Sequence, residues 1–310
     1  MNHRVLGFVV ATVLGCIPGT PAEAEEPAVL ENDCEMIGAD ITNSMKVDLI
    51  DPAAPQATRQ KALDAYLALV DNVQCPEYGY SIGLLYRFGD ELPGNLLPKD
   101  VQKARELLLR YAEDGNLVAY ADLAEMALKD GNAREAMRWT QVYLYFVGTT
   151  DKQFKEGDAF HRSGYNGDLL KRANEAWVRQ RPSLSRDSIR ADLTSYLQSH
   201  KEQTLRRSAD QGEQKKRIPE DALLSVKPGH GTCDVDLGRV GGAYVKYVIE
   251  VQPDGRPSRI VIQDFAPRIE AAKKLMQCLK AYEFESFPGT EARVGVMPVV
   301  YGFEYGPRIK

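Results

Sequence analysis

Cysteine is the residue type in this sequence whose number and spacing best support a chemical prediction. Four cysteines follow the first 24 residues, namely Cys34, Cys75, Cys233 and Cys278. An even number of cysteines in an oxidising compartment predicts two disulfides, and four cysteines allow three connectivities. We favour Cys34 with Cys75 and Cys233 with Cys278, because each pair then lies inside one of the two regions described below. Buried free thiols are the alternative interpretation.

The residues that commonly carry catalysis form no recognisable motif. The four histidines are dispersed along the chain at His3, His161, His200 and His230. There is no Gly-x-Ser-x-Gly elbow, no His-Glu-x-x-His and no phosphate-binding glycine loop. His230 and Cys233 are too few ligands for a tetrahedral zinc site, and we interpret acidic pairs such as Asp254 with Asp264 as a solvated surface. The sequence therefore predicts no catalytic residue, no metal, no cofactor and no enzyme activity.

The N-terminus predicts export. Val5 to Leu14 is an uncharged apolar run, shorter than the roughly 20 residues of a membrane-spanning helix, and small residues flank Glu23. We predict a signal peptide over residues 1–24, cleavage before Glu25, and a mature protein in the periplasm of a Gram-negative bacterium. Two alternatives would leave the chain tethered to the membrane. The first is lipidation of Cys16, whose preceding residues resemble a lipobox, and the second is an uncleaved anchor.

Length and charge exclude several classes of protein. A chain of 310 residues predicts about two domains, each able to bury its own core. With 44% hydrophobic residues it is neither disordered nor collagen-like. The net charge is −5 and no long basic run occurs, so we expect no nucleic-acid partner.

Residues 25–207 predict a helical domain. Apolar residues recur at intervals of three to four, as in the stripe of Ala62, Tyr66, Leu67 and Val70, and no strand is expected before His200. Short turns at Gly115-Asn116 and Asp130-Gly131-Asn132 force neighbouring helices to run antiparallel. The expected fold of this domain is a stack of helical hairpins.

A repeat lies inside this stack, over about residues 76–147. SIGLLYRFG (81–89) aligns with DLAEMALKDG (122–131), and KARELLLRYAEDGN (103–116) aligns in part with NAREAMRWTQVYLY (132–145). These segments resemble the Sel-one-like branch of the tetratricopeptide-repeat superfamily. The resemblance implies helical hairpins that bind partner proteins and carry no chemistry of their own.

Residues 208–228 are charged and lack an apolar stripe, so they predict a linker, and residues 229–310 predict a second domain. Val245 to Val251 alternates with strand spacing, and Pro253-Asp254-Gly255 is typical of a hairpin turn. A second strand, a helix with a strong apolar stripe and a third strand follow. The expected fold is a small antiparallel sheet with one packed helix in the order ββαβ, so the chain is of the α plus α+β class. Pro298 lies within the third strand and favours either a sheet edge or a bulge there.

This second region is similar to the C-terminal domain of the TonB family. The similarity rests on YVIEVQPDG (247–255), KLMQCLKAYEFESF (274–287) and the final strand at 299–303. It implies a periplasmic module that docks on a partner by adding strands at a sheet edge. The candidate edge is Val294 to Tyr305, with four candidate contact residues: Val296, Val300, Tyr301 and Phe303. An edge covered by the preceding chain is the alternative.

Together these expectations describe a non-catalytic periplasmic adaptor, associated with transport, whose helical repeats and sheet module each bind a protein partner. The alternative is a TonB-type energy transducer that acts on outer-membrane transport. Energy transducers of that family keep an uncleaved N-terminal helix and a long proline-rich spacer, and this sequence has neither. We therefore favour the adaptor.

Overall fold

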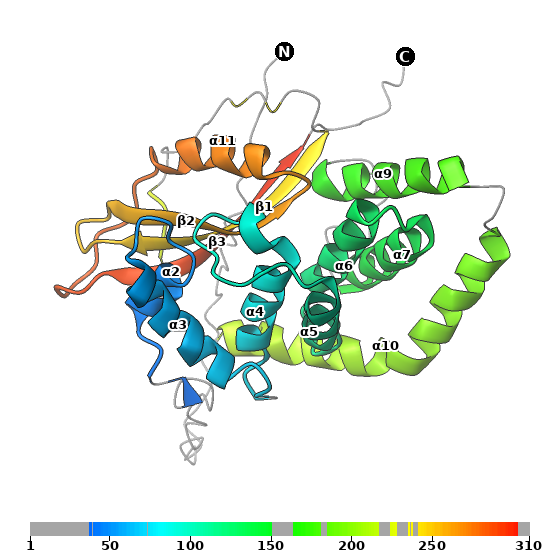
Figure 1. Cartoon of the computed structure of the whole chain (residues 1–310), viewed down its shortest axis with the longest axis horizontal. Coiled ribbons are helices and arrows are strands. Elements are labelled where there is room, and N and C mark those ends of the chain that lie inside the picture. Colours follow the sequence, from blue (N-terminus) through cyan, green and yellow to red (C-terminus); the bar gives the residue numbers. More distant parts are fainter. Residues whose placement is uncertain are drawn as a thin grey trace, which may run out of the picture.

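A computed structural model describes residues 37–38, 40–72, 74–150, 164–180, 185–216, 224–227, 235, 237 and 241–302. The N-terminal part is helical and the C-terminal part contains a small antiparallel sheet (Figure 1), which confirms the coarse prediction of fold class. The helices before the sheet are α2 (Asn43–Asp48), α3 (Gln56–Ala68), α4 (Pro76–Phe88), the 3-10 turn η1 (Gly89–Glu91), α5 (Val101–Glu113), α6 (Val118–Lys129), α7 (Ala133–Thr150), α9 (Gly164–Gln180) and α10 (Arg186–Lys216). The later elements are β1 (Gly242–Val251), β2 (Pro257–Ala266), α11 (Ile269–Leu279) and β3 (Arg293–Gly302).

The helices from α4 to α9 pack in sequence order. Helix α4 packs against α5, α6 against α7, and α9 against α7 (Figure 1). The start of α5 follows from its sequence, because the Asp100 side chain accepts hydrogen bonds from the backbone N–H groups of Gln102 and Lys103. Helix α6 is buried on nearly all sides from Ala119 to Ala127, as expected of a helix in the middle of an array.

Helix α10 extends beyond the predicted end of the helical domain. We expected a linker from residue 208, but α10 continues without a break to Lys216. Polar residues with good helix propensity maintain it, and α10 packs along α5 and α7. The backbone of Gly115, just after α5, approaches Ser208 so closely that a Cβ at Gly115 would lie 2.4 Å from the Ser208 nitrogen. Gln211 donates a hydrogen bond to the carbonyl oxygen of Asp114, at 2.8 Å.

The sheet has the strand order β2-β1-β3 with antiparallel pairing throughout. The predicted turn between β1 and β2 is present. Gly255 has φ +86°, and a Cβ there would lie 2.1 Å from the Phe284 carbonyl oxygen, so this turn requires glycine. Among the described strands β3 pairs with β1 alone, so it lies at the edge of the described sheet, as Pro298 predicts.

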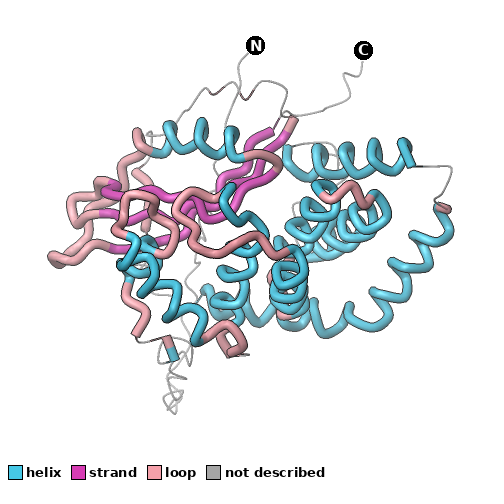
Figure 2. Tube along the Cα trace, viewed as in Figure 1, coloured by secondary structure: helices cyan, strands magenta, loops and turns pink. Residues whose placement is uncertain are grey.

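Both faces of the central strand β1 are covered. The Tyr247 hydroxyl donates to the carbonyl oxygen of Ala272 in α11, whereas the neighbouring Lys246 donates to the Tyr80 hydroxyl of α4. Successive residues of a strand point to opposite faces, so one face of the sheet packs on α11 and the other on the N-terminal helices (Figure 2). A single hydrophobic core consequently runs from Ile82 of α4 through Ile249 of β1 to Leu275 of α11.

Candidate functional site

Two of the four predicted disulfide cysteines lie in described parts of the chain. Cys75 immediately precedes α4, Cys278 lies near the end of α11, and both are disulfide-bonded. Cys34 and Cys233, their partners in the connectivity that we favour, lie outside the described residues, as does Cys16. The pairing and the lipidation alternative remain predictions.

The four candidate contact residues of the last strand have different surroundings. Val296 and Val300 are 57% and 43% exposed, and they lie on the same face of β3. Tyr301 is only 3% exposed and points to the other face, so its side chain is not available to a partner and its assignment is corrected here. Phe303 lies outside the described residues.

A cluster of charged and hydroxyl groups is buried where the helices meet the sheet. Arg87 of α4 donates through Nη1 to Oδ1 of Asp122 in α6, at 2.6 Å, and to Oδ1 of Asp264 in β2, at 2.9 Å. The Tyr80 hydroxyl lies 3.1 Å from Oδ2 of Asp122 and 3.3 Å from Oδ2 of Asp264. Lys246 donates to the same hydroxyl at 2.6 Å. These five residues, Tyr80, Arg87, Asp122, Lys246 and Asp264, are called the junction cluster below.

An irregularity in the sheet brings Asp264 into this cluster. Lys246 pairs with Asp264, but the next residue, Tyr247, pairs with Ile262, so β2 has one extra residue at Gln263. Directly opposed residues share a face, so Asp264 faces the helices with Lys246, whereas Ile262 faces α11 with Tyr247. Without this bulge, strict alternation would place Asp264 on the same face as Ile262.

Burial sets the electrostatics of the junction cluster. The Asp122 and Asp264 side chains are 3% and 0% exposed. Burial, and after it the charge of Asp264, raise the pKa of Asp122 to about 7 against the opposing charge of Arg87. Burial disfavours the charged form of Arg87, but Asp122 and Asp264 outweigh this effect and raise its pKa, so the guanidinium stays charged. Burial and the two carboxylates also keep the pKa of Tyr80 well above its usual value, so its hydroxyl stays protonated.

A second ion-pair network lies beside the first, within the helical part. Arg172 of α9 binds both carboxylate oxygens of Glu125, at 2.7 and 2.6 Å, and donates through Nε to Asp168. The Tyr165 hydroxyl donates to Glu125 at 2.9 Å. Burial raises the pKa of Glu125, but Arg172 more than offsets this, so the pKa lies below its usual value. Glu125 therefore remains ionised, unlike its neighbour Asp122 near neutral pH.

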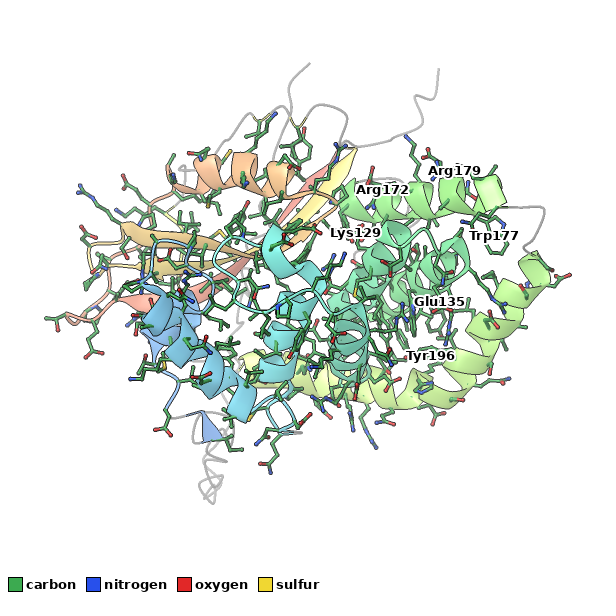
Figure 3. All side chains as sticks on the ribbon, viewed as in Figure 1. Lys129, Glu135, Arg172, Trp177, Arg179 and Tyr196 are labelled. Carbon is green, nitrogen blue, oxygen red and sulfur yellow. The ribbon has the colours of Figure 1, made fainter. Side chains whose placement is uncertain are left out.

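A groove of about 530 Å3 opens above both networks, between α4, α6, α9 and the start of α11. Its walls are apolar where Phe88 stacks on Phe265, with ring centroids 4.2 Å apart. Its rim carries acidic residues, such as Glu91, and basic residues, such as Lys129 and Arg172. The two basic residues are labelled in Figure 3. Because Lys129 pairs with Glu91 and Arg172 with Glu125, the rim does not select a ligand of one charge.

The two aspartates of the junction cluster are shielded from solvent. In the described part of the chain, no three His, Cys, Asp or Glu side chains gather closely enough to hold a metal ion. Within the same residues, no helix is both long and apolar enough to cross a membrane.

The junction cluster was not expected from the sequence. We expected Asp264 on a solvated acidic surface, which is wrong, because Asp264 is completely buried. A signal was present in charged residues that interrupt apolar segments, such as Arg87 in SIGLLYRFG and Asp122 in VAYADLAEMALK. A charge in a segment that is otherwise buried on all sides needs a partner, although the sequence does not reveal which one.

No protein-family model, no curated protein sequence and no solved structure matches this chain. The resemblances to Sel-one-like repeats and to the TonB C-terminal domain therefore rest on the quoted motifs alone.

Proposed function

We propose that this protein is a non-catalytic, exported adaptor that binds partner proteins, with a Sel-one-like helical array and a TonB-C-like sheet module. The observation that carries the proposal is the position of β3 at the edge of the described sheet. Among the described strands β3 pairs with β1 alone, and an edge strand is a place where another strand can be added. Strand addition at such an edge is a recurrent way to bind an extended peptide.

Side chains on β3 support the same conclusion. Three large apolar side chains are exposed in the described part of the chain, and two of them, Val296 and Val300, lie on β3. They share a face with Pro298, which is also exposed. An apolar stripe beside an open strand edge gives a partner both backbone hydrogen bonds and a hydrophobic contact.

Within the helical array, several aromatic side chains pack in the core instead of facing a partner. Tyr80 contacts the molecule's own sheet through the junction cluster, and Tyr78, Tyr143 and Phe146 are buried. We therefore propose that the helical array binds a partner at the groove between α4, α6, α9 and the start of α11. On this proposal a partner strand is bound at β3, and the groove accepts a second part of the same partner or of another protein.

The edge can be tested by site-specific photo-crosslinking. A photoreactive side chain at position 296 or 300, in the full chain with its disulfides intact, is expected to cross-link a partner in periplasmic extract of a Gram-negative host. The matched control is position 178 on α9, where Val178 is also exposed, at 53%, but lies away from the sheet edge.

A second test uses Val296→Lys with Val300→Lys, which places charges on the stripe and should abolish the cross-link from a probe at a neighbouring β3 position. Equal cross-linking from position 178, or none from β3, would contradict the proposal.

Export is tested separately by intact-protein mass spectrometry of the mature chain, before and after reduction. A start at Glu25 with two disulfides is expected for a soluble periplasmic adaptor. A lipid on Cys16, or a retained Met1, would mean membrane tethering and would favour the energy-transducer alternative.

A further inference from the structure

The junction cluster contains two carboxylates that come from the two different parts of the molecule. Asp122 belongs to the helical array and Asp264 to the sheet, and both accept hydrogen bonds from the same nitrogen atom of Arg87. Their other oxygen atoms both face the Tyr80 hydroxyl, at 3.1 and 3.3 Å. The two carboxylates are therefore held against each other, in a place that water does not reach, whenever the sheet is docked on the helices.

Counting hydrogens shows that this arrangement is one proton short when both aspartates are ionised. The Tyr80 hydroxyl has one hydrogen and can donate it to only one of the two carboxylates. Its oxygen accepts a hydrogen bond from Lys246, at 2.6 Å, and has a second lone pair. If Asp122 carries a proton, it donates to that lone pair while Tyr80 donates to Asp264, and each contact then joins a donor to an acceptor.

We propose that the Asp122–Asp264 pair binds one proton when the sheet docks on the helical array, so that docking takes up a proton and separation releases it. The sheet would then be held most firmly in acidic surroundings and less firmly as the pH rises to neutrality. The proposal does not depend on the adaptor function, since it concerns the contact between the two parts of this chain.

The electrostatic surroundings support a proton on Asp122. The titratable and charged groups around this carboxylate come from every element packed on it: Tyr80 and Arg87 of α4, Tyr111 of α5, Glu125 of α6, Tyr143 of α7, Tyr165 and Arg172 of α9, Tyr244 and Lys246 of β1, and Asp264 of β2. Burial raises the pKa of each of these tyrosines, and Arg87 and Arg172 stay charged. The pKa of Glu125 is lowered, whereas that of Asp122 is raised to about 7, so Asp122 is the group expected to titrate near neutrality.

The sign of the pH effect follows from this shift. The pKa of Asp122 is 3.8 when unperturbed and about 7 in the folded protein, so the folded state binds more protons between these values. Stability contributed by the proton is complete at low pH and is lost as the pH rises through about 7. In the upper part of this pH window, the titration of Asp122 is expected to raise the unfolding equilibrium constant about tenfold per pH unit. Above the window this contribution should level off.

The experiment compares Asp122→Asn with the wild type in the full, oxidised chain. Asparagine has the shape of a protonated aspartate and can donate the same hydrogen bond. Urea unfolding is measured from about pH 5.5 to about pH 8.5, where the wild type should show the rise and the variant should lack it. Asp64→Asn is the matched control, because Asp64 is exposed on α3, and it should keep the wild-type slope.

A local measurement tests docking itself. Hydrogen exchange of β2 amides, corrected for intrinsic rates, should report an opening that becomes more frequent with pH up to about 7 in the wild type but not in Asp122→Asn. Equal pH dependence in both proteins would overturn the proposal. If the variant does not fold, carbon NMR of aspartate carboxyls in the wild type still decides the question. A carboxyl that titrates near neutrality supports the proposal, and its absence refutes it.

Discussion

Two arginines connect the N-terminal helices to the sheet, and they differ mainly in their access to water. Arg87 bridges Asp122 and Asp264 with side-chain exposures of 6%, 3% and 0%. Arg259 of β2 is 28% exposed and pairs with Asp48 of α2, with Asp51 and with Glu250 of β1, whose side chains are 11%, 10% and 15% exposed. Each network therefore joins at least one carboxylate of the N-terminal part to one of the sheet through a single guanidinium.

The difference between these networks shows how burial changes the role of the same set of charges. In the outer network, water reaches the Arg259 guanidinium although its carboxylate partners are largely buried, so desolvation costs less than in the junction cluster and salt screens part of the attraction. In the junction cluster the charges have no alternative partners in solvent, so each group depends on the others being present. We expect the outer network to add modest stability and the junction cluster to set whether the sheet docks at all.

The largest expected effect comes from removing the buried arginine. Arg87→Met keeps most of the side-chain volume but leaves two buried carboxylates without their cation, so the free energy of unfolding should fall by about 3–5 kcal/mol at neutral pH. Urea unfolding measures this loss. The loss should be smaller in acid, because protonation of an aspartate relieves part of the repulsion. A loss below about 1 kcal/mol would show that the two networks do not differ in this way.

Much of what positions these networks could be predicted from the sequence, because it depends on short-range patterns. The cap at Asp100, the turn at Gly255 and the edge strand marked by Pro298 each follow from a few neighbouring residues. The packing of the sheet on the helices could not be predicted in this way. Lys246 and Glu250 gave β1 a polar face that is typical of contact with solvent, whereas in the structure that face is covered by α2 and α4.

The junction cluster could not be predicted for a related reason. Its members are separated by up to 184 residues, and only tertiary contact brings them together. Asp264 also depends on the bulge at Gln263, since the regular alternation of a strand would direct it to the other face. Similarly, the polar segment after Arg207 remains helical where Ser208 and Gln211 contact the turn that follows α5, and its own composition does not reveal this contact.

An intermediate loss of stability is expected when the Tyr80 hydroxyl, which Lys246 and both aspartates share, is removed. Tyr80→Phe keeps the ring stacked on Tyr111 but removes the oxygen that Lys246 and both aspartates contact, so stability should fall by about 1–3 kcal/mol. The variant is best measured alone and combined with Asp122→Asn. The two losses should not add, because both changes act on one hydrogen-bond network. Strict additivity would indicate that Tyr80 and Asp122 act independently.

The smallest effect, and the sharpest comparison, comes from the outer arginine. Arg259→Met should lower the free energy of unfolding by about 1–2 kcal/mol, less than Arg87→Met, since water reaches the guanidinium although Asp48 and Glu250 are only 11% and 15% exposed. This difference from the wild type should shrink when the salt concentration is raised from about 0.05 M to about 1 M, because salt screens exposed charges. The effect of Arg87→Met should persist over the same range, since ions do not enter the junction cluster. If both variants lose the same stability and respond equally to salt, burial is not what separates the two networks, and the proton-linked docking of the sheet would lose its physical basis.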